Sequence, residues 1–542
     1  MDSHQTIRYW LCAISLLSFN FISLGVSAKT YTIAANRYDT LPEGASSIFR
    51  DIMSKPETVW GEVTDVDVKK LAEADTFYCS FDDIQVELFA MYYGENNNSD
   101  YRYVHYVSLD HDADAYVSIY DNYVHIDLRT LNGMYRMVSI SESKIAIVRY
   151  EPVILEESDY DRSTNDVVDP ENTLTERNAE MASTPTIRVL FLYTDSALTM
   201  MSGFSQETAM KEEVYRYINE GNQSFANSNI DANLQLAYVG RTNYNESSHT
   251  WNEALNHFYG QSDSYMDEVH DLRDKYAADI CLLMLKKEFV HCGEAKAIRA
   301  DESTAFAIIL PDHSNCGWRY AAIHEIGHLL GCRHNMEKDS TIIPSFFAYA
   351  HGYVNRVPYD AWCTIMSYEL SDDYLYSPRK LYWSNPNVYY NGVATGTVMR
   401  ENNARVWNER AGTVAAFLNK QNEINYTGAN NNTDAIFESI EAGSQISVGS
   451  GYEIQSGQTV EMTAPTIYLL PGTTIKAGAK FLARTKTENS PDSQFIRERY
   501  ITPDIRKSAG ESTPSAIKIL QNGHIFIIRD GKTYTLQGQL AE

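Results

Sequence analysis

Positive charge is scarce in this 542-residue sequence, where 45 Lys and Arg stand against 72 Asp and Glu and the formal net charge is -27. A chain this acidic argues against binding nucleic acid or an anionic membrane through general electrostatics. Apolar runs long enough to span a bilayer are missing after the N-terminal segment. We find neither long internal repeats nor heptads, so the sequence predicts neither a repeat architecture nor a coiled coil.

The one pronounced apolar run covers residues 9–26, with Arg8 before it and Ser27-Ala28 after it. A basic start, a short apolar stretch and a small-residue exit are typical of a secretory signal peptide. A membrane anchor is the alternative, but Asn20 and several serines dilute the run. We therefore predict a signal peptide at 1–28 and an exported protein, secreted or held at the cell surface, with no transmembrane anchor after signal removal.

Cysteine is also sparse, with 7 residues in all, and Cys12 would leave with the signal. Five of the remaining six lie between Cys281 and Cys363, and such clustering in an exported chain favours disulfides without fixing their pairing. Cys281 itself falls in the apolar run 280–285, which predicts a buried thiol.

The residue pattern changes several times along the rest of the chain. Residues 29–153 hold alternating strand-like runs, and 155–186 are polar and acidic, as in a linker. A folded segment between a signal peptide and a linker is typical of a propeptide, which would act as the protein's own inhibitor. From 187 strands alternate with helices, which predicts a mixed α/β (α+β) domain. After 419 short β-like runs return, with Asn-Gly and Asp-Gly turns near the end.

We therefore predict five regions: a signal peptide at 1–28, a β-rich propeptide at 29–185 with an acidic linker from about 154, a central mixed α/β domain at 186–420, a β accessory region at 421–486, and a linker with a β meander at 487–542. Arg162 and Arg177 in the linker are candidate processing points.

One segment of the central domain carries a metal-ligand pattern, His324-Glu325-Ile326-Gly327-His328-Leu329-Leu330-Gly331-Cys332-Arg333-His334. Its apolar residues predict a buried helix over 321–330. His324 and His328 lie one turn apart on that helix and can take adjacent corners of a zinc tetrahedron. Gly331 can adopt a positive φ that ends the helix and lets His334 supply a third ligand. A helix with merely satisfied histidines is the alternative, which the joint occurrence of Gly331 and His334 disfavours.

Glu325 points about 100° away from its neighbour His324 around the helix. That direction places the carboxylate beside the metal, where a general base can take a proton from water. With three histidine ligands the fourth position stays open, as a catalytic zinc site requires and a structural site does not.

The whole pattern resembles the extended zinc motif of the metzincin clan of metalloproteases, and most closely that of bacterial reprolysin-like enzymes. The likeness covers most of 187–419, and three further stretches support it: Tyr349–Tyr353, Ser384–Asn387 and Glu401–Arg405. It implies a metzincin catalytic domain with a five-stranded twisted mixed sheet, long helices and a zinc helix that divides two lobes. One departure is Asn335, where many reprolysins have aspartate after the third histidine.

The stretch Cys363-Thr364-Ile365-Met366-Ser367-Tyr368 resembles the methionine turn of metzincins. Met366 would form a soft apolar floor under the histidines, and an ordinary core methionine is the alternative. In the astacin and serralysin branches a tyrosine at the position of Tyr368 contacts zinc and helps to stabilise the oxyanion. A packed tyrosine is the alternative here.

The same likeness implies two disulfides, Cys292 with Cys316 and Cys332 with Cys363, the second tying the zinc loop to the methionine turn. The run 305–310 between the first pair is expected to be the sheet-edge strand that pairs with an extended substrate. Cys79 lies in the predicted propeptide, where its thiolate could keep the enzyme latent by occupying the open metal position. A free thiol is the alternative, because the residues around Cys79 lack the family's switch motif.

Two weaker signals complete the sequence. Asp110, Asp112 and Asp114 alternate like the start of a calcium loop, but the loop's glycine and glutamate are missing, which favours a solvated turn. Reprolysins often bind calcium, so this ion stays compatible with the chain although its ligands are not placed. The meander over 517–540 resembles short sorting domains that some Gram-negative bacteria use for export across the outer membrane, with a plain β accessory module as the alternative.

The sequence thus predicts a secreted zinc metalloendopeptidase, made as a zymogen, that hydrolyses internal peptide bonds of protein substrates. Its competitor is a catalytically inactive, zinc-stabilised surface adhesion or binding protein. The intact Glu325, Gly331 and Met366 disfavour this competitor, since a degenerate site would be expected to lose its base first.

Overall fold

The protein is described by a computed structural model. It covers residues 29–34, 41–55, 58–93, 101–109, 113–130, 133–150, 184–286, 292–311, 320–339, 348–357, 360–368, 371–372, 375–485, 517–521, 524–529 and 532–535. The predicted signal peptide and almost all of the predicted acidic linker lie outside these residues. Among the helices of the described ranges, none combines the length and apolar character needed to cross a bilayer.

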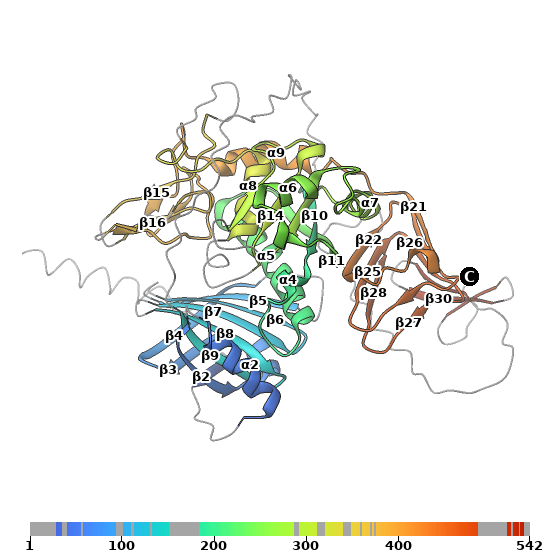
Figure 1. The fold of residues 1–542 in the computed structure, drawn as a ribbon, viewed down its shortest axis with the longest axis horizontal. Coiled ribbons are helices and arrows are strands. Elements are labelled where there is room, and N and C mark those ends of the chain that lie inside the picture. Colours follow the sequence, from blue (N-terminus) through green and yellow to red (C-terminus); the bar gives the residue numbers. More distant parts are fainter. Residues whose placement is uncertain are drawn as a thin grey trace, which may run out of the picture.

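The N-terminal region forms one nine-stranded sheet, with the strands in the order β1-β3-β4-β5-β6-β7-β8-β9-β2. Its elements are β1 (Thr30–Ala34), α2 (Glu43–Met53), β2 (Thr58–Asp65), α3 (Val68–Ala72), β3 (Thr76–Phe81), β4 (Ile84–Tyr93), β5 (Tyr101–Val107), β6 (Asp114–Tyr120), β7 (Tyr123–Thr130), β8 (Gly133–Ser141) and β9 (Lys144–Tyr150). Phe77, Leu88 and Ile126 are fully buried in a core of its own. The strand-like runs in the sequence thus form a single β-rich unit, below the green helices in Figure 1.

The central region is built on a mixed sheet whose first five strands are ordered β13-β14-β12-β10-β11. These strands are β10 (Thr186–Tyr193), β11 (Asn233–Arg241), β12 (Ile280–Met284), β13 (Gly293–Ala295) and β14 (Phe306–Ile309). β13 alone among these five runs antiparallel to its neighbour. β12 is buried on both faces, as its continuous apolar sequence predicts. The mixed strand directions are compatible with the predicted sheet, but the whole sheet has more than the five predicted strands.

The prediction that residues 305–310 form the sheet edge is wrong. β14 lies between β12 and β13, and the outermost strand on this side is β13, where Glu294 pairs with Ile308. The described part of the chain between β12 and β14 contains a short antiparallel strand of three paired residues, too few to leave a period-2 pattern in the sequence.

Helices cover both faces of the central sheet (Figure 1). Those of the central region are α4 (Asp195–Leu198), α5 (Gln206–Ser228), α6 (Trp251–Tyr259), α7 (Glu268–Lys275), α8 (Ala321–Leu330) and α9 (Asn403–Val414). Side chains alternate along β10, so that Val189 and Phe191 share a core with α5, α8 and α9, while Leu190 and Leu192 share a second core with α6 and α7. The predicted metal-binding helix therefore lies in one of two packed layers.

The C-terminal region continues this sheet instead of forming a detached module. β22 (Ala435–Glu441) pairs antiparallel with β11, and β25 (Thr459–Ala464) and β28 (Lys480–Thr485) follow in parallel, which gives eight strands in all. Arg188 on β10 spans the junction, because its Nη2 donates to Ser439 O at 2.8 Å. The sheet thus runs across the boundary predicted near residue 420.

A parallel β-solenoid underlies the C-terminal region, against the prediction that the chain has no long repeat. A second ladder joins β21 (Glu423–Tyr426), β23 (Gln445–Val448) and β26 (Thr466–Leu469) in parallel. Glu423 pairs with Gln445 and Gln445 with Thr466, so each rung takes about 21 or 22 residues. Each rung shares only turn positions and buried apolar positions with the next, which is why the period does not stand out as sequence identity.

Three antiparallel strands lie where the sequence predicts a meander. They are β29 (Ile517–Gln521), β30 (His524–Arg529) and β31 (Lys532–Thr535), and β29 pairs with β26 of the solenoid. Whether this meander serves in sorting stays a prediction.

Candidate metal centre

The helix that carries the histidine pattern is α8, over the residues that the sequence predicts. All ten of its residues are buried. It ends at Gly331, whose φ of 116° is left-handed, as predicted. The Gly331 N–H donates to His328 O and the Cys332 N–H to Gly327 O, both at 2.9 Å, which is the Schellman pattern that reverses a chain after a helix. This reversal returns the chain toward the helix face that carries His324 and His328.

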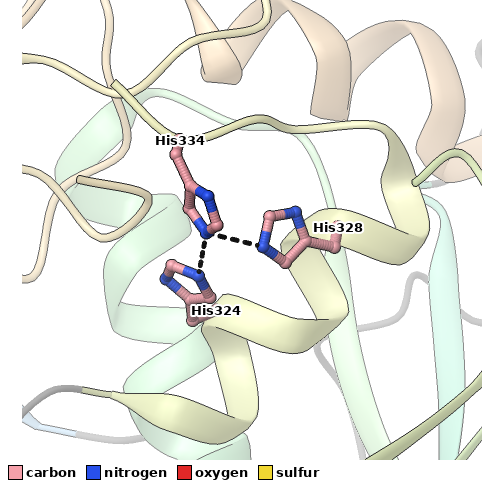
Figure 2. A group of neighbouring side chains, drawn as sticks. All are labelled: His324, His328 and His334. Carbon is pink, nitrogen blue, oxygen red and sulfur yellow. Dashed lines mark hydrogen bonds between the residues drawn. The ribbon is translucent and has the colours of Figure 1, made fainter. Parts of the chain in front are cut away.

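Three imidazoles meet at the end of α8 (Figure 2). His334 Nε2 lies 3.1 Å from His324 Nε2 and 3.0 Å from His328 Nε2. Ligand nitrogens at tetrahedral zinc would stand about 3.3 Å apart, given Zn–N bonds near 2.0–2.1 Å. Within the described ranges this is the one group of three or more His, Cys, Asp or Glu side chains close enough to hold a metal ion. The donor set therefore fits the predicted metal.

Backbone carbonyls orient two of these rings. His324 Nδ1 donates to Ile365 O at 2.8 Å, and His328 Nδ1 donates to Cys332 O at 2.9 Å. Because a carbonyl oxygen only accepts, each Nδ1 carries the proton, and each Nε2 keeps a lone pair that points to the shared centre. A third bond, from His351 Nδ1 to His334 O at 2.8 Å, fixes the backbone of the loop that carries His334.

Met366 packs against the underside of α8, as the methionine-turn likeness implies. Its side chain is fully buried. A Cβ placed on Gly327 would lie 2.7 Å from Met366 Sδ and 2.8 Å from two ring carbons of Trp383, closer than real contacts allow. Gly327 is therefore needed at the centre of the helix so that Met366 and Trp383 can approach its backbone. The sequence reading missed Trp383, although it directly precedes the family-like stretch 384–387.

Glu325 lies against the edge strand of the sheet. Its side chain is almost fully buried, and a Cβ on Gly293 would stand 2.6 Å from its Oε1. Gly293 thus gives the carboxylate room beside the backbone of β13. This glycine was also missed, because no local pattern connects residue 293 with residue 325.

Tyr368 lies beside the third histidine, and Asn335 holds it there. The rings of Tyr368 and His334 meet edge to face at 4.7 Å between centroids. The Tyr368 N–H donates to Asn335 Oδ1 at 3.1 Å, and Asn335 Nδ2 donates to Glu337 Oε2 at 2.9 Å. Asn335 therefore joins the loop after the histidines to the methionine turn, and its amide oxygen accepts the bond that an aspartate oxygen could also accept.

The predicted disulfide between Cys332 and Cys363 is wrong, since both are buried free thiols. The Cys363 Sγ–H donates instead to Ser377 O at 3.4 Å. Cys281 is a buried free thiol, as predicted. Cys292 is disulfide-bonded. Cys316 lies outside the described residues, so the pairing of Cys292 with Cys316 stays a prediction.

The structure does not bring Cys79 into the histidine cluster. It lies on β3 in the core of the N-terminal sheet, fully buried beside Phe77 and Leu88, none of which belongs to the core around the histidines. Burial raises the pKa of the Cys79 thiol well above its usual value, so a thiolate is disfavoured. Of the predicted calcium-like aspartates, Asp114 opens β6 and lies 3.7 Å from His105 Nε2, while Asp110 and Asp112 are outside the described residues.

Comparisons with known proteins place this region in context. The family model described as metallo-peptidase family M12, of the reprolysin type, matches residues 183–384. A peptidyl-Asp metalloendopeptidase of Stenotrophomonas maltophilia (strain K279a) is 34% identical over 291 residues, which are 54% of this chain and 65% of that protein. The chain thus spans somewhat less than two thirds of that relative.

A second relative is covered almost completely. The peptidyl-Asp metalloendopeptidase of Pseudomonas fragi is 32% identical over 198 residues, which are 36% of this chain and 99% of that sequence. Among solved structures, metalloproteinase-II from Bacteroides fragilis matches 53% of this chain and 85% of its own at 13% identity, with a TM-score of 0.31. A score this low supports no argument about the fold.

Proposed function

The chain belongs to metallo-peptidase family M12, and from this membership and the histidine geometry we propose that it is a zinc-dependent endopeptidase. The observation that carries the proposal is the convergence of three oriented Nε2 atoms next to a buried carboxylate. His324, His328 and His334 would hold the ion. When bound, zinc would polarise the scissile carbonyl and lower the pKa of the attacking water.

Glu325 is the general base of the proposed reaction. Its carboxylate would take a proton from the attacking water and later pass it to the leaving amine. Gly293 supports this role, because the absence of a side chain there lets the carboxylate lie against β13. An extended peptide that adds to the outer edge of β13 would bring its backbone past Glu325. Near-complete burial of Glu325 limits competing contacts with bulk water.

Tyr368 has a supporting role in the proposed site. Its ring packs edge to face on His334, and its backbone is tied to Asn335. We therefore propose that Tyr368 mainly orients the third ligand. A direct role of its hydroxyl in stabilising the oxyanion is the finer proposal, which a Tyr368→Phe variant tests through kcat at unchanged zinc content.

Substrate choice is proposed from the two relatives, whose names describe peptidyl-Asp metalloendopeptidases. A cation near the metal would favour an aspartyl side chain in the substrate, because it can form a charge-assisted hydrogen bond with the carboxylate. Lys338 Nζ stands 5.3 Å from the centroid of the Tyr368 ring, which itself lies 4.7 Å from the His334 ring. Lys338 is exposed, so a substrate can reach it. We propose that Lys338 contributes to the binding of an aspartyl carboxylate.

Export is a further part of the proposal. The N-terminal apolar run with its small-residue exit supports a signal peptide, and the C-terminal strands support a sorting or accessory module. In this proposal residues 29–150 belong to a precursor form. Mass spectrometry of the secreted protein checks both ends, because a mature chain that still begins at Met1 would contradict it.

The proposed chemistry is tested with Glu325→Ala and casein as substrate. We expect kcat to fall by roughly 10²–10⁴-fold, as is usual for loss of a general base. Glu302→Ala, which removes an exposed carboxylate of the same region, is the matched control and should leave the rate unchanged. Casein cleavage by Glu325→Ala at the parent rate would refute the mechanism.

A further inference from the structure

Helix α5 lies between the central sheet and the N-terminal sheet and is buried on both sides. Its apolar residues, such as Met210 and Val214, face the central core. Its opposite face is charged, yet Glu212, Arg216 and Glu220 are only 1–3% exposed. Within the helix, Arg216 Nη1 lies 3.1 Å from Glu220 Oε1 and Nη2 lies 3.3 Å from Glu213 Oε2. A helix with one apolar and one charged face is typical of a protein surface.

The N-terminal sheet supplies polar partners to that charged face. Ser118 Oγ donates to Glu212 Oε1, and His125 Nδ1 lies 3.7 Å from the other oxygen of the same carboxylate. Further along the helix, Gln223 Nε2 donates to His105 Nδ1 at 2.8 Å. Buried charges are tolerated only where such partners compensate their lost hydration. The two surfaces are therefore complementary in charge and hydrogen bonding.

Tyrosines fill the remainder of the contact. Tyr101 and Tyr120 stack on Tyr215 of α5, with ring centroids 5.0 and 5.4 Å apart. The Tyr123 hydroxyl donates to Ser202 O at 2.7 Å. Tyrosine combines a large apolar area with a polar tip, a property typical of interfaces between separately folded partners.

One side chain of the N-terminal sheet reaches the elements of the metal centre. Arg129 Nη2 donates to the hydroxyl of Tyr320 at 3.2 Å, and its Nη1 donates to Arg379 O at 3.5 Å. Tyr320 immediately precedes α8 and has a left-handed φ of 57°. Arg379 Nη2 in turn donates to Ser367 O at 2.8 Å, next to Met366. Arg129 thus contacts both the start of the metal-binding helix and the segment that braces the methionine turn.

We propose that the charged face of α5, together with Tyr320, is a docking surface for residues 29–150 as a separable domain. This domain stays bound after the chain is cut between 151 and 183, and it contacts the metal centre through Arg129 without adding a metal ligand. Its consequence for latency rests on the proposed peptidase function, whereas the docking itself does not.

Three observations support a separable partner. The N-terminal sheet has two cores of its own, and it adds only tyrosines to the core around α5. Cys79 is the one cysteine between residues 29 and 280 and is a free thiol, so no disulfide would hold the cut domain. The one metal-ligand cluster in the described part of the chain contains no residue of the N-terminal sheet.

The test uses the full chain with Glu325→Ala, which prevents self-digestion, and a recognition sequence for a site-specific protease placed within 154–183. After cutting, size-exclusion chromatography at micromolar and nanomolar concentrations reports whether the two fragments remain together. Glu212→Lys reverses a buried charge in the surface, and Glu207→Lys is the matched control, because it reverses an exposed charge on the same helix. Arg129→Ala probes the contact from the other side.

We expect the parent and Glu207→Lys fragments to co-elute at micromolar concentration. Glu212→Lys and Arg129→Ala should each raise the dissociation constant at least about tenfold, since each leaves buried polar groups unpaired. If circular dichroism shows that the uncut Glu212→Lys chain does not fold, the affinity measured for Arg129→Ala alone decides whether the surface is a docking surface. Separation of the parent fragments at micromolar concentration would overturn the proposal, as would equal affinities for the parent and Arg129→Ala. Co-elution and the dissociation constants do not depend on peptide hydrolysis by this protein. A failure of the proposed peptidase activity would therefore appear only in the casein assay.

Discussion

Replacing Gly327 with alanine tests whether the methionine turn is pressed against the metal-binding helix. Inside an ordinary helix this change stabilises by about 1 kcal/mol, because glycine is a poor helix former. Here the new Cβ would stand 2.7 Å from Met366 Sδ and 2.8 Å from the Trp383 ring, and both side chains are fully buried. Overpacking of this kind costs roughly 1–3 kcal/mol. We expect a net loss of about 1–2 kcal/mol of unfolding free energy, taking the overpacking cost at the upper part of that range.

The matched control is Gly412→Ala in α9. A Cβ there would meet nothing nearer than Pro185 Cγ at 4.0 Å, and the position is exposed. This variant should gain about 0.5–1 kcal/mol. At about 2–4 °C per kcal/mol for a domain of this size, thermal unfolding should show a lower melting temperature for Gly327→Ala and a higher one for Gly412→Ala.

Metal affinity supplies a second readout for Gly327→Ala. Displacing Met366 would shift the backbone around Ile365, whose carbonyl orients His324. Loss of such supporting contacts commonly weakens metal binding by about 10–100-fold, which competition with a chromophoric chelator measures. If Gly327→Ala melted higher than the parent and bound zinc equally well, the close packing of Met366 and Trp383 on α8 would be refuted.

Three further outcomes are expected. The folded chain should lose stability as pH rises through the pKa of His125. Burial lowers that pKa, but Asp127 beside it and Glu212 on α5 outweigh burial and Arg216 and raise it above 6.5. The stabilising charge of His125 is therefore complete below 6.5 and lost above the raised value. His125→Gln should flatten this dependence in urea denaturation of the uncut chain, and a parent that loses no more stability than His125→Gln between pH 6 and pH 9 would contradict it. Lys338→Glu should lower kcat/KM for an aspartyl peptide about tenfold or more relative to its asparaginyl analogue, and an unchanged ratio would exclude Lys338 from recognition. Chelation should abolish hydrolysis and added zinc should restore it, whereas activity that survives exhaustive dialysis against chelator would rule out a metal mechanism.

The metal centre could be predicted because its determinants are local in sequence. Histidines four residues apart share a helix face whatever the rest of the chain does, and Gly331 marks the end of that helix through its own backbone freedom. The position of Met366 was accessible through the family likeness. These features needed no knowledge of which distant segments meet.

Features that depend on distant contacts were missed or mistaken. The contact of Gly293 with Glu325 and of Trp383 with Gly327 joins residues that no periodicity relates. The predicted Cys332–Cys363 disulfide is wrong for the same reason, since sequence does not show whether two buried sulfurs meet. The solenoid was not predicted because its successive rungs need only similar lengths and a few shared turn positions. These requirements leave little sequence identity between one rung and the next.

The seam between β11 and β22 joins the central region and the solenoid in one continuous sheet. Three pairs of residues cross it, and Arg188 reaches from β10 to the carbonyl of Ser439 on the far side. A recombinant chain that stops near 420 would leave the β11 edge unpaired and the Arg188 guanidinium without that acceptor, and bare edges of this kind promote aggregation. Expression vectors for the central region should therefore extend through residue 485, because the solenoid covers the β11 edge of its sheet.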